Sequence, residues 1–216
     1  EAKHTLNSVS LVSPEGGFDA HYEKQRLVAW GEYLPLEQYC RQFSVFDRVQ
    51  RFLPGQGNGV LSCGAVRQPQ LNSNRQVKLG ALICFESMIP DLARIRALAG
   101  ADILVVPTND GWFGDNSAIF HHFEMGIFRA VESGLPLIQS GNTGISGVID
   151  AYGRPLGETR PNQVAHVAAS VPLHNLATPY RRWGDWFPLA LLAVSSLSWL
   201  ATFGRAASQH DSQSAL

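Results

Sequence analysis

Two apolar runs with a helical segment between them limit the fold of this chain more than any other feature. VKLGALIC at 77–84 and ADILVV at 101–106 are short and bounded by polar or turn residues, which is typical of strands buried in a sheet. Between them, PDLARIRALA at 90–99 predicts a helix with proline in its first turn and Gly100 just beyond its end. This succession of strand, helix and strand indicates an α/β architecture.

The same alternation continues on both sides and predicts a layered α/β domain over about residues 1–172. Residues 22–39 have mixed character and predict an ordered loop that leads into a helix, whereas 117–133 predicts a helix with one apolar side. The predicted strands lie at 8–12, 60–66, 77–84, 101–106, 136–140, 145–149 and 164–171.

The C-terminal part differs in composition from this domain, which we assign to residues 1–175. After a linker at 176–185, the segment WFPLALLAVSSLSWLATF at 186–203 contains no charged residue. As a helix it would be roughly 27 Å long, just enough to cross the core of a bilayer, so we predict a transmembrane helix. A buried amphipathic helix is the alternative. GRAASQHDSQSAL at 204–216 has the composition of a disordered tail.

The charge of the chain argues against one class of partner. Charged residues make up 16% of the sequence, against a usual share of about a quarter, and the formal net charge is −1. Because no basic stripe is visible, we expect no nucleic-acid partner. The low share of charged residues is unusual for a soluble protein and agrees with a membrane segment.

The three cysteines have no CxxC spacing, so we expect no metal site, and nothing indicates an organic cofactor. A disulfide between Cys40 and Cys63 is an alternative to free thiols in an oxidising compartment, and it would leave Cys84 unpaired. Cys84 itself is either core filler in a buried strand or a nucleophile presented where that strand gives way to a turn.

A nucleophilic Cys84 needs a base and a positive charge nearby, because the thiolate is the attacking form. Lys24 lies among aromatic and aliphatic neighbours and is a candidate for stabilising a developing oxyanion. Glu32 is a candidate for holding that lysine or for acting as a general base. Taken alone, each of these two residues would more often be an ordinary surface side chain.

Two further features invite a functional interpretation. TNDGWFGDN at 108–116 is a turn-rich loop, and an aromatic residue such as Trp112 is costly to expose there unless it meets a ligand, a membrane or a lid. His121 and His122 could form a metal or base pair. Since neighbouring positions on a helix point apart, we expect one exposed and one packed histidine instead.

Several segments, taken in order, resemble the apolipoprotein N-acyltransferases, which are membrane members of the nitrilase superfamily. The resemblance runs from about residue 4 to residue 200. It is most specific in the block at 24–32, where a lysine precedes a glutamate, in the NDGWFGD block and in the C-terminal apolar span. The matching segments are YEKQRLVAWGEYLPLE, GALICFES, GADILVVPTNDGWFGD, HHFEMGIFRAVESGLPLIQSGNTGISGVIDAYG and the apolar segment that follows.

The resemblance implies a nitrilase-like α-β-β-α sandwich, incomplete at its N-terminus. It also implies an enzyme of the bacterial inner membrane, multi-pass when intact, with its catalytic domain on the outer, periplasmic face. The partners would be a phospholipid acyl donor, typically phosphatidylethanolamine, and an apolipoprotein acceptor. The sn-1 acyl chain would pass through a cysteine thioester to the α-amine of the N-terminal S-diacylglyceryl-cysteine of that apolipoprotein.

Individual residues match the site of these enzymes. The matches are Cys84 as the nucleophile, Lys24 as the oxyanion-stabilising lysine, Glu32 as a supporting glutamate, Glu86 as the acidic residue after the nucleophile, and Trp112 as the tryptophan of the loop beside the lipid entry. Phe85 stands where the family commonly has tyrosine, which puts a hydrogen-bonding role at that position in doubt.

The general-base glutamate of the family precedes the lysine block, and none of Glu1, Glu15 or Glu23 fits its motif. We therefore expect a C-terminal fragment of a longer enzyme that is inactive on its own. Two alternatives stay open. One is a nitrilase-type amidohydrolase, in which water resolves the thioester, and the other is an inactive, membrane-tethered fragment that only binds.

Overall fold

A computed structural model describes residues 5–47, 49–68, 73–173 and 175–213 of the chain, without the side chains of 65–68, 73–75, 201 and 203–213. The chain divides into two compact units, Glu1–Arg181 and Arg182–Leu216. The first unit holds every strand of the described residues, and the second consists mainly of one helix.

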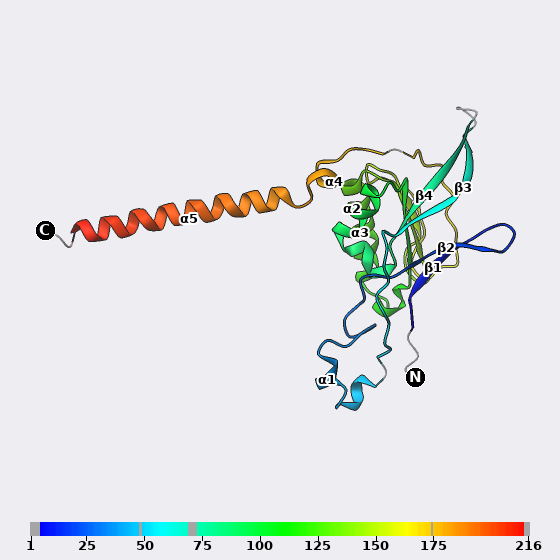
Figure 1. The fold of residues 1–216 in the computed structure, drawn as a ribbon, viewed down its shortest axis with the longest axis horizontal. Coiled ribbons are helices and arrows are strands. Elements are labelled where there is room, and N and C mark those ends of the chain that lie inside the picture. Colours follow the sequence, from blue (N-terminus) through cyan, green and yellow to red (C-terminus); the bar gives the residue numbers. More distant parts are fainter. Residues whose placement is uncertain (1–4, 48, 69–72, 174, 214–216) are drawn as a thin grey trace. The chain divides into compact units, whose positions relative to one another are not determined.

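A six-stranded sheet forms the centre of the first unit (Figure 1). Its strands lie side by side in sequence order, and β4, β5 and β6 run parallel to one another, whereas the outer pairs are antiparallel. The strands are β3 (Val60–Gln68), β4 (Ser73–Ala81), β5 (Ile103–Thr108), β6 (Leu137–Gly141), β7 (Gly147–Ile149) and β8 (Pro155–Glu158). The parallel strands bring their carboxyl ends to one edge, where functional groups of α/β folds gather.

Two helices, α2 (Pro90–Leu98) and α3 (Ala118–Ser133), cover one face of this sheet (Figure 1). Each begins and ends within one residue of the predicted bounds, because Pro90 occupies the first turn of α2 and Gly134 takes the left-handed conformation that ends α3. The side chains between the helices and the sheet form the core, to which each buried leucine contributes about 2 kcal/mol. The core includes Leu82, Leu92, Leu104, Val106, Ile119, Phe123, Leu137 and Ile149.

A separate two-stranded sheet, β1 (Ser8–Val12) with β2 (Phe18–Glu23), stands at the start of the chain, and the segment after it holds α1 (Glu37–Cys40) and the 3₁₀ turn η1 (Ser44–Phe46). The sequence predicts β1 but not β2, since FDAHYE has no clear alternation and buries only Tyr22. This hairpin matters for the site because Lys24 follows directly after β2.

One predicted strand is wrong. Residues 164–171 form no strand, and β8 takes the place beside β7 instead. The reason is the tight turn before β8, in which the Asp150 carboxylate accepts hydrogen bonds from the backbone N–H groups of Tyr152 and Arg154. This turn reverses the chain at once, so the nearer segment pairs with β7 although its sequence is less apolar.

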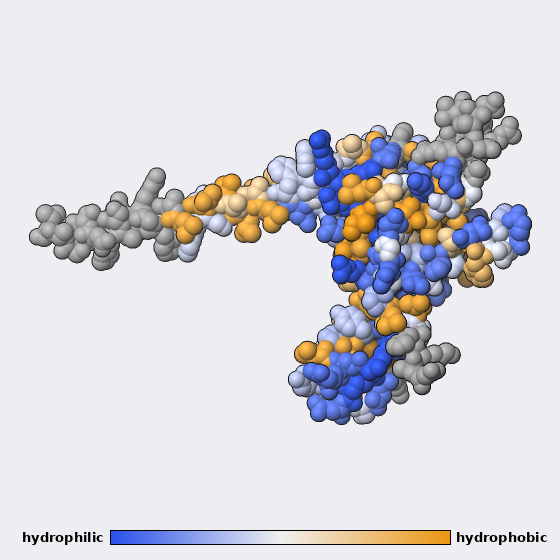
Figure 2. All heavy atoms as spheres, in the orientation of Figure 1, coloured by the Kyte–Doolittle hydropathy of each residue, from blue (hydrophilic) through white to orange (hydrophobic). Residues whose placement is uncertain are grey.

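The second unit contains α5 (Trp186–Gln213), and a short helix, α4 (Pro179–Trp183), stands at the boundary between the units. The predicted helix at 186–203 is present and continues into the predicted disordered tail, where no proline stops it before residue 213. Apolar residues are exposed along its described part, as Figure 2 shows in orange. They include Leu189, Leu192 and Leu197.

The structure does not show the predicted transmembrane helix at 186–203. Among the helices whose side chains the structure describes, none is long and apolar enough to cross a bilayer. Residues 201 and 203 of the predicted span lie outside the described side chains.

Two glycines with positive φ give a matched test of the packing between β3 and α2. A Cβ at Gly59 would collide with the buried guanidinium of Arg96, whereas a Cβ at Gly57 meets nothing within 4 Å. Both substitutions to alanine share the left-handed strain, so we expect Gly59→Ala to lose about 2 kcal/mol more of the free energy of unfolding than Gly57→Ala. Denaturant unfolding measures both, and equal losses would contradict the packing described.

Candidate active site

Cys84 lies on a strained turn at the end of a central strand. After β4 ends at Ala81, the chain crosses two buried residues and enters the 3₁₀ turn η2 (Cys84–Met88). Cys84 has a φ of 53°, a left-handed conformation that costs a residue with a Cβ atom about 1–3 kcal/mol. Such a cost persists only where the surroundings enforce it, and strained positions of this kind cluster at functional sites.

Three hydrogen bonds hold this turn. The Ile83 backbone N–H donates to Glu86 Oε2 at 2.8 Å, and the carbonyl oxygen of Cys84 accepts from Ser87 Oγ at 2.9 Å. The same carbonyl oxygen lies 3.2 Å from Nε2 of His122. The backbone of Cys84 is therefore fixed from inside the protein, while its side chain stays partly exposed.

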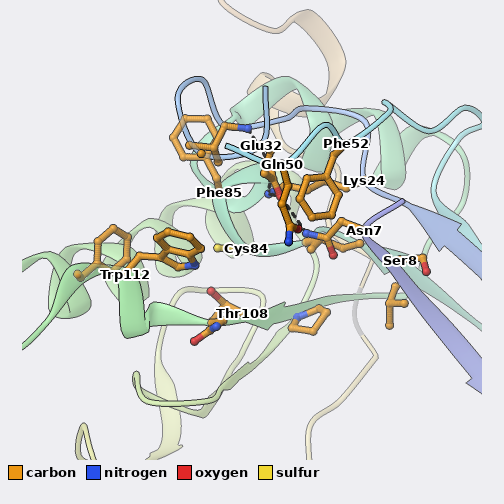
Figure 3. Close-up of a pocket in the computed structure, with 17 residues that line it drawn as sticks. Asn7, Ser8, Lys24, Glu32, Gln50, Phe52, Cys84, Phe85, Thr108 and Trp112 are labelled. Carbon is orange, nitrogen blue, oxygen red and sulfur yellow. Dashed lines mark hydrogen bonds and ion pairs between the residues drawn. The ribbon is translucent and has the colours of Figure 1, made fainter. Parts of the chain in front are cut away.

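The side chain of Cys84 faces a cavity of about 750 Å³. Figure 3 shows its sulfur between Trp112 on one side and the Lys24–Glu32 pair on the other. The structure thus places Cys84, Lys24, Glu32, Phe85 and Trp112 around one cavity. The other described residues that line it are Asn7, Ser8, Val9, Val28, Gly31, Gln50, Phe52, Ile83, Pro107, Thr108, Asn109 and Phe113.

Lys24 and Glu32 form a buried ion pair in the wall of this cavity (Figure 3). Lys24 is only 2% exposed, and its Nζ donates to both carboxylate oxygens of Glu32, at 2.9 and 2.8 Å. Glu32 also accepts hydrogen bonds from the Val28 backbone N–H and from Asn7 Nδ2. Burial alone would raise the pKa of Glu32, but the bonds from Lys24, Val28 and Asn7 outweigh it and lower that pKa below its usual value.

Glu86 lies behind the cavity wall and not among the lining residues. Its side chain is fully buried and accepts hydrogen bonds from the backbone N–H groups of Gln25, Arg26 and Ile83, and from the Tyr22 hydroxyl. One carboxylate therefore ties the residues that follow Lys24 to the residue that precedes Cys84. This placement gives Glu86 a positioning role and no contact with a ligand in the cavity.

The buried charge of Glu86 is balanced through Tyr22. Arg96 is fully buried on α2, donates to the Tyr22 hydroxyl at 2.7 Å and lies over the Tyr22 ring. Burial raises the pKa of Tyr22 well above its usual value, with the neighbouring Glu86 carboxylate acting in the same direction against Arg96. Tyr22 therefore stays neutral, and its hydroxyl donates a hydrogen bond to the Glu86 carboxylate.

The two aromatic residues at the cavity mouth are the most exposed of the predicted site residues. Trp112 belongs to the 3₁₀ turn η3 (Asp110–Phe113) and is 82% exposed, and Phe85 is 38% exposed. Water gives neither side chain a favourable environment, so both mark a surface suited to an apolar ligand. Phe85 presents a ring without a hydroxyl to the cavity, and thus no hydrogen-bonding group.

Sequence reasoning missed a buried chain of Asp110, His122 and Ser87 beneath the nucleophile turn. Asp110 Oδ1 lies 2.7 Å from His122 Nδ1, and His122 Nε2 lies 2.9 Å from Ser87 Oγ. These distances are those of a Ser-His-Asp triad, but all three side chains are at most 1% exposed, so Ser87 cannot reach a substrate. The only signal was the histidine pair, for which the prediction of one exposed and one packed residue is confirmed.

The predicted alternative of a Cys40–Cys63 disulfide is wrong, since all three cysteines are free. Cys40 belongs to α1 and donates to the carbonyl oxygen of Pro35, whereas Cys63 belongs to β3. The two thiols serve different local structures, and Cys84 is the cysteine that lines the cavity.

This arrangement can carry out acyl transfer. A thiol at the cavity wall can attack a carbonyl carbon, and the buried ammonium of Lys24 can stabilise the oxyanion that forms. Among the lining residues that the structure describes, Glu32 is the one carboxylate. Because it is bonded to Lys24, it serves to hold and orient that ammonium.

Comparison with known sequences places these features in context. The sequence profile of the carbon-nitrogen hydrolase family matches residues 1–178. The apolipoprotein N-acyltransferase of Geobacter metallireducens is 36% identical over 207 residues, which cover 95% of this chain and 38% of that protein. That of Thermotoga maritima is 34% identical, over 84% of this chain and 34% of the protein. The chain thus spans little more than a third of the length of these relatives.

Solved structures support the fold. A carbon-nitrogen hydrolase from Helicobacter pylori matches with a TM-score of 0.53 and 22% identity, over 78% of this chain and 57% of that one. Saccharomyces cerevisiae Nit3, a member of branch 10 of the nitrilase superfamily, matches with a TM-score of 0.51 and 17% identity, over 73% and 50%. The predicted nitrilase-like α/β fold is therefore confirmed.

The Lys24–Glu32 pair makes a testable contribution to stability. Glu32→Gln leaves the Lys24 ammonium buried without its counter-charge, so we expect a loss of about 3 kcal/mol in the free energy of unfolding at pH 7. Because the pKa of Glu32 is lowered by folding, this contribution is present above the ordinary pKa of a glutamate, about 4.3, and disappears as the pH falls through the folded value.

The measurement is denaturant unfolding of both proteins from pH 7 down to pH 3, taken as the difference at each pH. Glu37→Gln serves as the matched control, because Glu37 also bonds basic side chains but lies at the surface, with Arg41 and Arg51. We expect the control to change stability little. A difference for Glu32→Gln that does not shrink in acid would contradict the charged pair.

Proposed function

This chain belongs to the carbon-nitrogen hydrolase family, and from that premise we propose that it carries the nucleophile of an apolipoprotein N-acyltransferase. The observation that supports the proposal most is the position of Cys84, on a strained turn and facing a cavity whose wall contains the buried Lys24–Glu32 pair. Within that family, the sequence identity of most of the chain to apolipoprotein N-acyltransferases favours N-acyl transfer over the other reactions.

The proposed reaction has two steps. In the first, the Cys84 sulfur attacks the carbonyl carbon of the sn-1 ester of a phospholipid, with phosphatidylethanolamine as the proposed donor. The ester C–O bond breaks, a thioester forms, and the thiol proton ends on the lysophospholipid hydroxyl that leaves. In the second, the α-amine of an S-diacylglyceryl-cysteine attacks the thioester carbonyl, the C–S bond breaks, and an amide and a free thiol result.

Lys24 acts in both steps, because each passes through an oxyanion on the same carbonyl carbon. Its ammonium reaches that oxygen from the cavity wall, where low exposure strengthens the interaction. Glu32 orients the ammonium, and Glu86 fixes the backbone on both sides of the reacting pair. No step requires a metal or an organic cofactor.

A lipid donor also explains features outside the reacting centre. Trp112 and Phe85 give the cavity an apolar mouth, as an acyl chain requires. The described apolar side chains of α5 are exposed, and a helix with such a surface needs lipid or protein to cover it. We infer an association with the bacterial inner membrane, with the site on its outer face, in keeping with the resemblance of the sequence.

The direct test is to trap the thioester. The whole reading frame that contains this sequence is expressed, and membranes of the expressing cells are incubated with phosphatidylethanolamine labelled in the sn-1 chain. We expect mass spectrometry to find the labelled acyl group on the Cys84 peptide, removable by hydroxylamine. Cys84→Ala abolishes the label, whereas Cys63→Ala, which changes a free thiol outside the cavity, retains it.

The second step is tested by adding a diacylglyceryl-cysteine peptide and measuring how fast the label leaves Cys84. Faster loss of the label from Cys84, with the acyl group recovered on the peptide amine, supports the acyltransferase. Loss at the same rate without the peptide would mean that water resolves the thioester, as in an amidohydrolase. A folded protein that never acquires the label would refute the proposal.

Trp112 allows a separate prediction about the donor. Because Trp112 is 82% exposed at the cavity mouth, Trp112→Ala removes contact area for an acyl chain and little packing. We expect the KM for phospholipid to rise about fivefold or more, as for the loss of about 1 kcal/mol or more of apolar contact, with unchanged Tm. Phe128→Ala is the matched control, since Phe128 is 54% exposed on α3 and does not line the cavity. Equal KM values for the two variants would contradict this role.

A further inference from the structure

The left-handed conformation of Cys84 leaves its carbonyl oxygen pointing into the protein, and two side chains meet it there. Ser87 Oγ donates to this oxygen at 2.9 Å, and His122 Nε2 lies 3.2 Å from it. Ser87 comes from the same turn, but His122 comes from α3. His122 is thus the contact that ties the backbone of the nucleophile to the helical layer.

The types of atom involved set the protons on His122. A carbonyl oxygen only accepts hydrogen bonds, so the contact with Cys84 requires a proton on Nε2. On the other side of the ring, Nδ1 lies 2.7 Å from Asp110 Oδ1, and that carboxylate oxygen already accepts from Thr108 Oγ1. The contact with Asp110 therefore anchors one side of the ring, while Nε2 on the other side faces the Cys84 carbonyl.

The alternative arrangement serves the turn less well. If Nε2 carried no proton, Ser87 would turn its hydroxyl to that nitrogen, 2.9 Å away, and the Cys84 carbonyl would lose both donors at once. A buried carbonyl without a donor is costly, and the cost would fall on the turn that already carries the backbone strain. A proton on Nε2 instead lets His122 donate to the Cys84 carbonyl and leaves the Ser87 hydroxyl free to donate to the same oxygen.

The remaining neighbours hold the ring in place. Phe113 packs its ring edge-on against His122, with 5.8 Å between ring centroids, and Arg129 of the same helix donates to the Ser87 carbonyl oxygen. Asp110 and Phe113 both belong to η3, the turn that also carries Trp112 at the cavity mouth. His122 therefore connects the nucleophile turn with the aromatic loop across the core.

The geometry points to His122 as a positioning residue for the reaction: anchored by Asp110, it holds the carbonyl of Cys84 and thereby aims the thiol into the cavity. This role rests on Cys84 being the nucleophile of the proposed function. His122 touches no substrate, because it is 1% exposed and does not line the cavity. Its effect passes through the backbone of Cys84.

The test uses the reactivity of the thiol and needs no lipid. The full chain is treated with iodoacetamide, and the alkylation rates of Cys84, Cys40 and Cys63 are followed separately by peptide mass spectrometry. Cys40 and Cys63 are free and partly exposed, so they report any general loosening of the fold. Three variants are compared, each at the same number of degrees below its own Tm: His122→Phe, His122→Gln and His122→Asn.

These variants separate a positioning role from mere packing. The Gln amide reaches as far as Nε2 and can donate to the Cys84 carbonyl, whereas the Asn amide reaches only as far as Nδ1 and keeps the bond to Asp110. We expect Cys84 alkylation to slow roughly five- to tenfold in His122→Phe and His122→Asn, as for one lost hydrogen bond, and to recover at least half-way in His122→Gln. The rates of Cys40 and Cys63 stay unchanged.

Equal Cys84 rates in the three variants and the unaltered chain would overturn the role of His122. So would a parallel rise at all three cysteines, which is the signature of a packing defect. If His122→Phe does not fold, the comparison of Gln with Asn decides alone, and equal rates there also overturn the role. Failure of the phospholipid label to reach Cys84 leaves these rates untouched, so the two hypotheses fail separately.

Discussion

The buried carboxylate of Glu86 is the interaction on which the geometry of the site depends. Its two oxygens accept hydrogen bonds from the backbone on both sides of the cavity, at Gln25 and Arg26 beside the lysine and at Ile83 beside the cysteine. Loss of these donors would leave a buried charge that costs several kcal/mol, so the two segments have a strong reason to stay together. Two parts of the chain that are far apart in sequence thus meet at one fixed separation, set by a group that never contacts the substrate.

The strain at Cys84 follows from the same architecture. β4 delivers the chain to the carboxyl edge of the sheet, and the turn must then present a side chain to the cavity while its own polar groups stay satisfied. A left-handed residue meets both demands, because its carbonyl turns inward to Ser87 and His122. The conformational cost is offset by those bonds and by the bond from Ile83 to Glu86. A glycine would avoid the strain but would carry no nucleophile.

The sequence predicted those parts of the fold whose residues are continuous and strongly patterned. β5 and the helices α2 and α3, bounded by proline or glycine, lie close to their predicted positions, whereas β4 was predicted at 77–84 and spans Ser73–Ala81. β2 and β8 escaped prediction because tertiary pairing, and not their own composition, makes them strands. The cavity brings together Cys84, Lys24, Glu32, Phe85 and Trp112, although their roles stay predictions. The chain of Asp110, His122 and Ser87 could not be predicted, because these residues come together only when η3, α3 and η2 pack against one another.

The charges around the cysteine are balanced pair by pair, and this balance bears on the chemistry. Lys24 has Glu32, and Arg96 has Glu86 through Tyr22. These two cations therefore each have an anion within the described part of the site before any substrate arrives. A negative charge that develops during the reaction must then compete with Glu32 for the ammonium of Lys24. Since Glu32 also keeps its bonds to Val28 and Asn7, it can yield part of that ammonium without becoming an unpaired buried charge. The N–H groups of Lys24 can thus be shared between Glu32 and an oxyanion. If Glu32 had no other donors, Lys24 could bind the oxyanion only by leaving Glu32 as an unpaired buried charge.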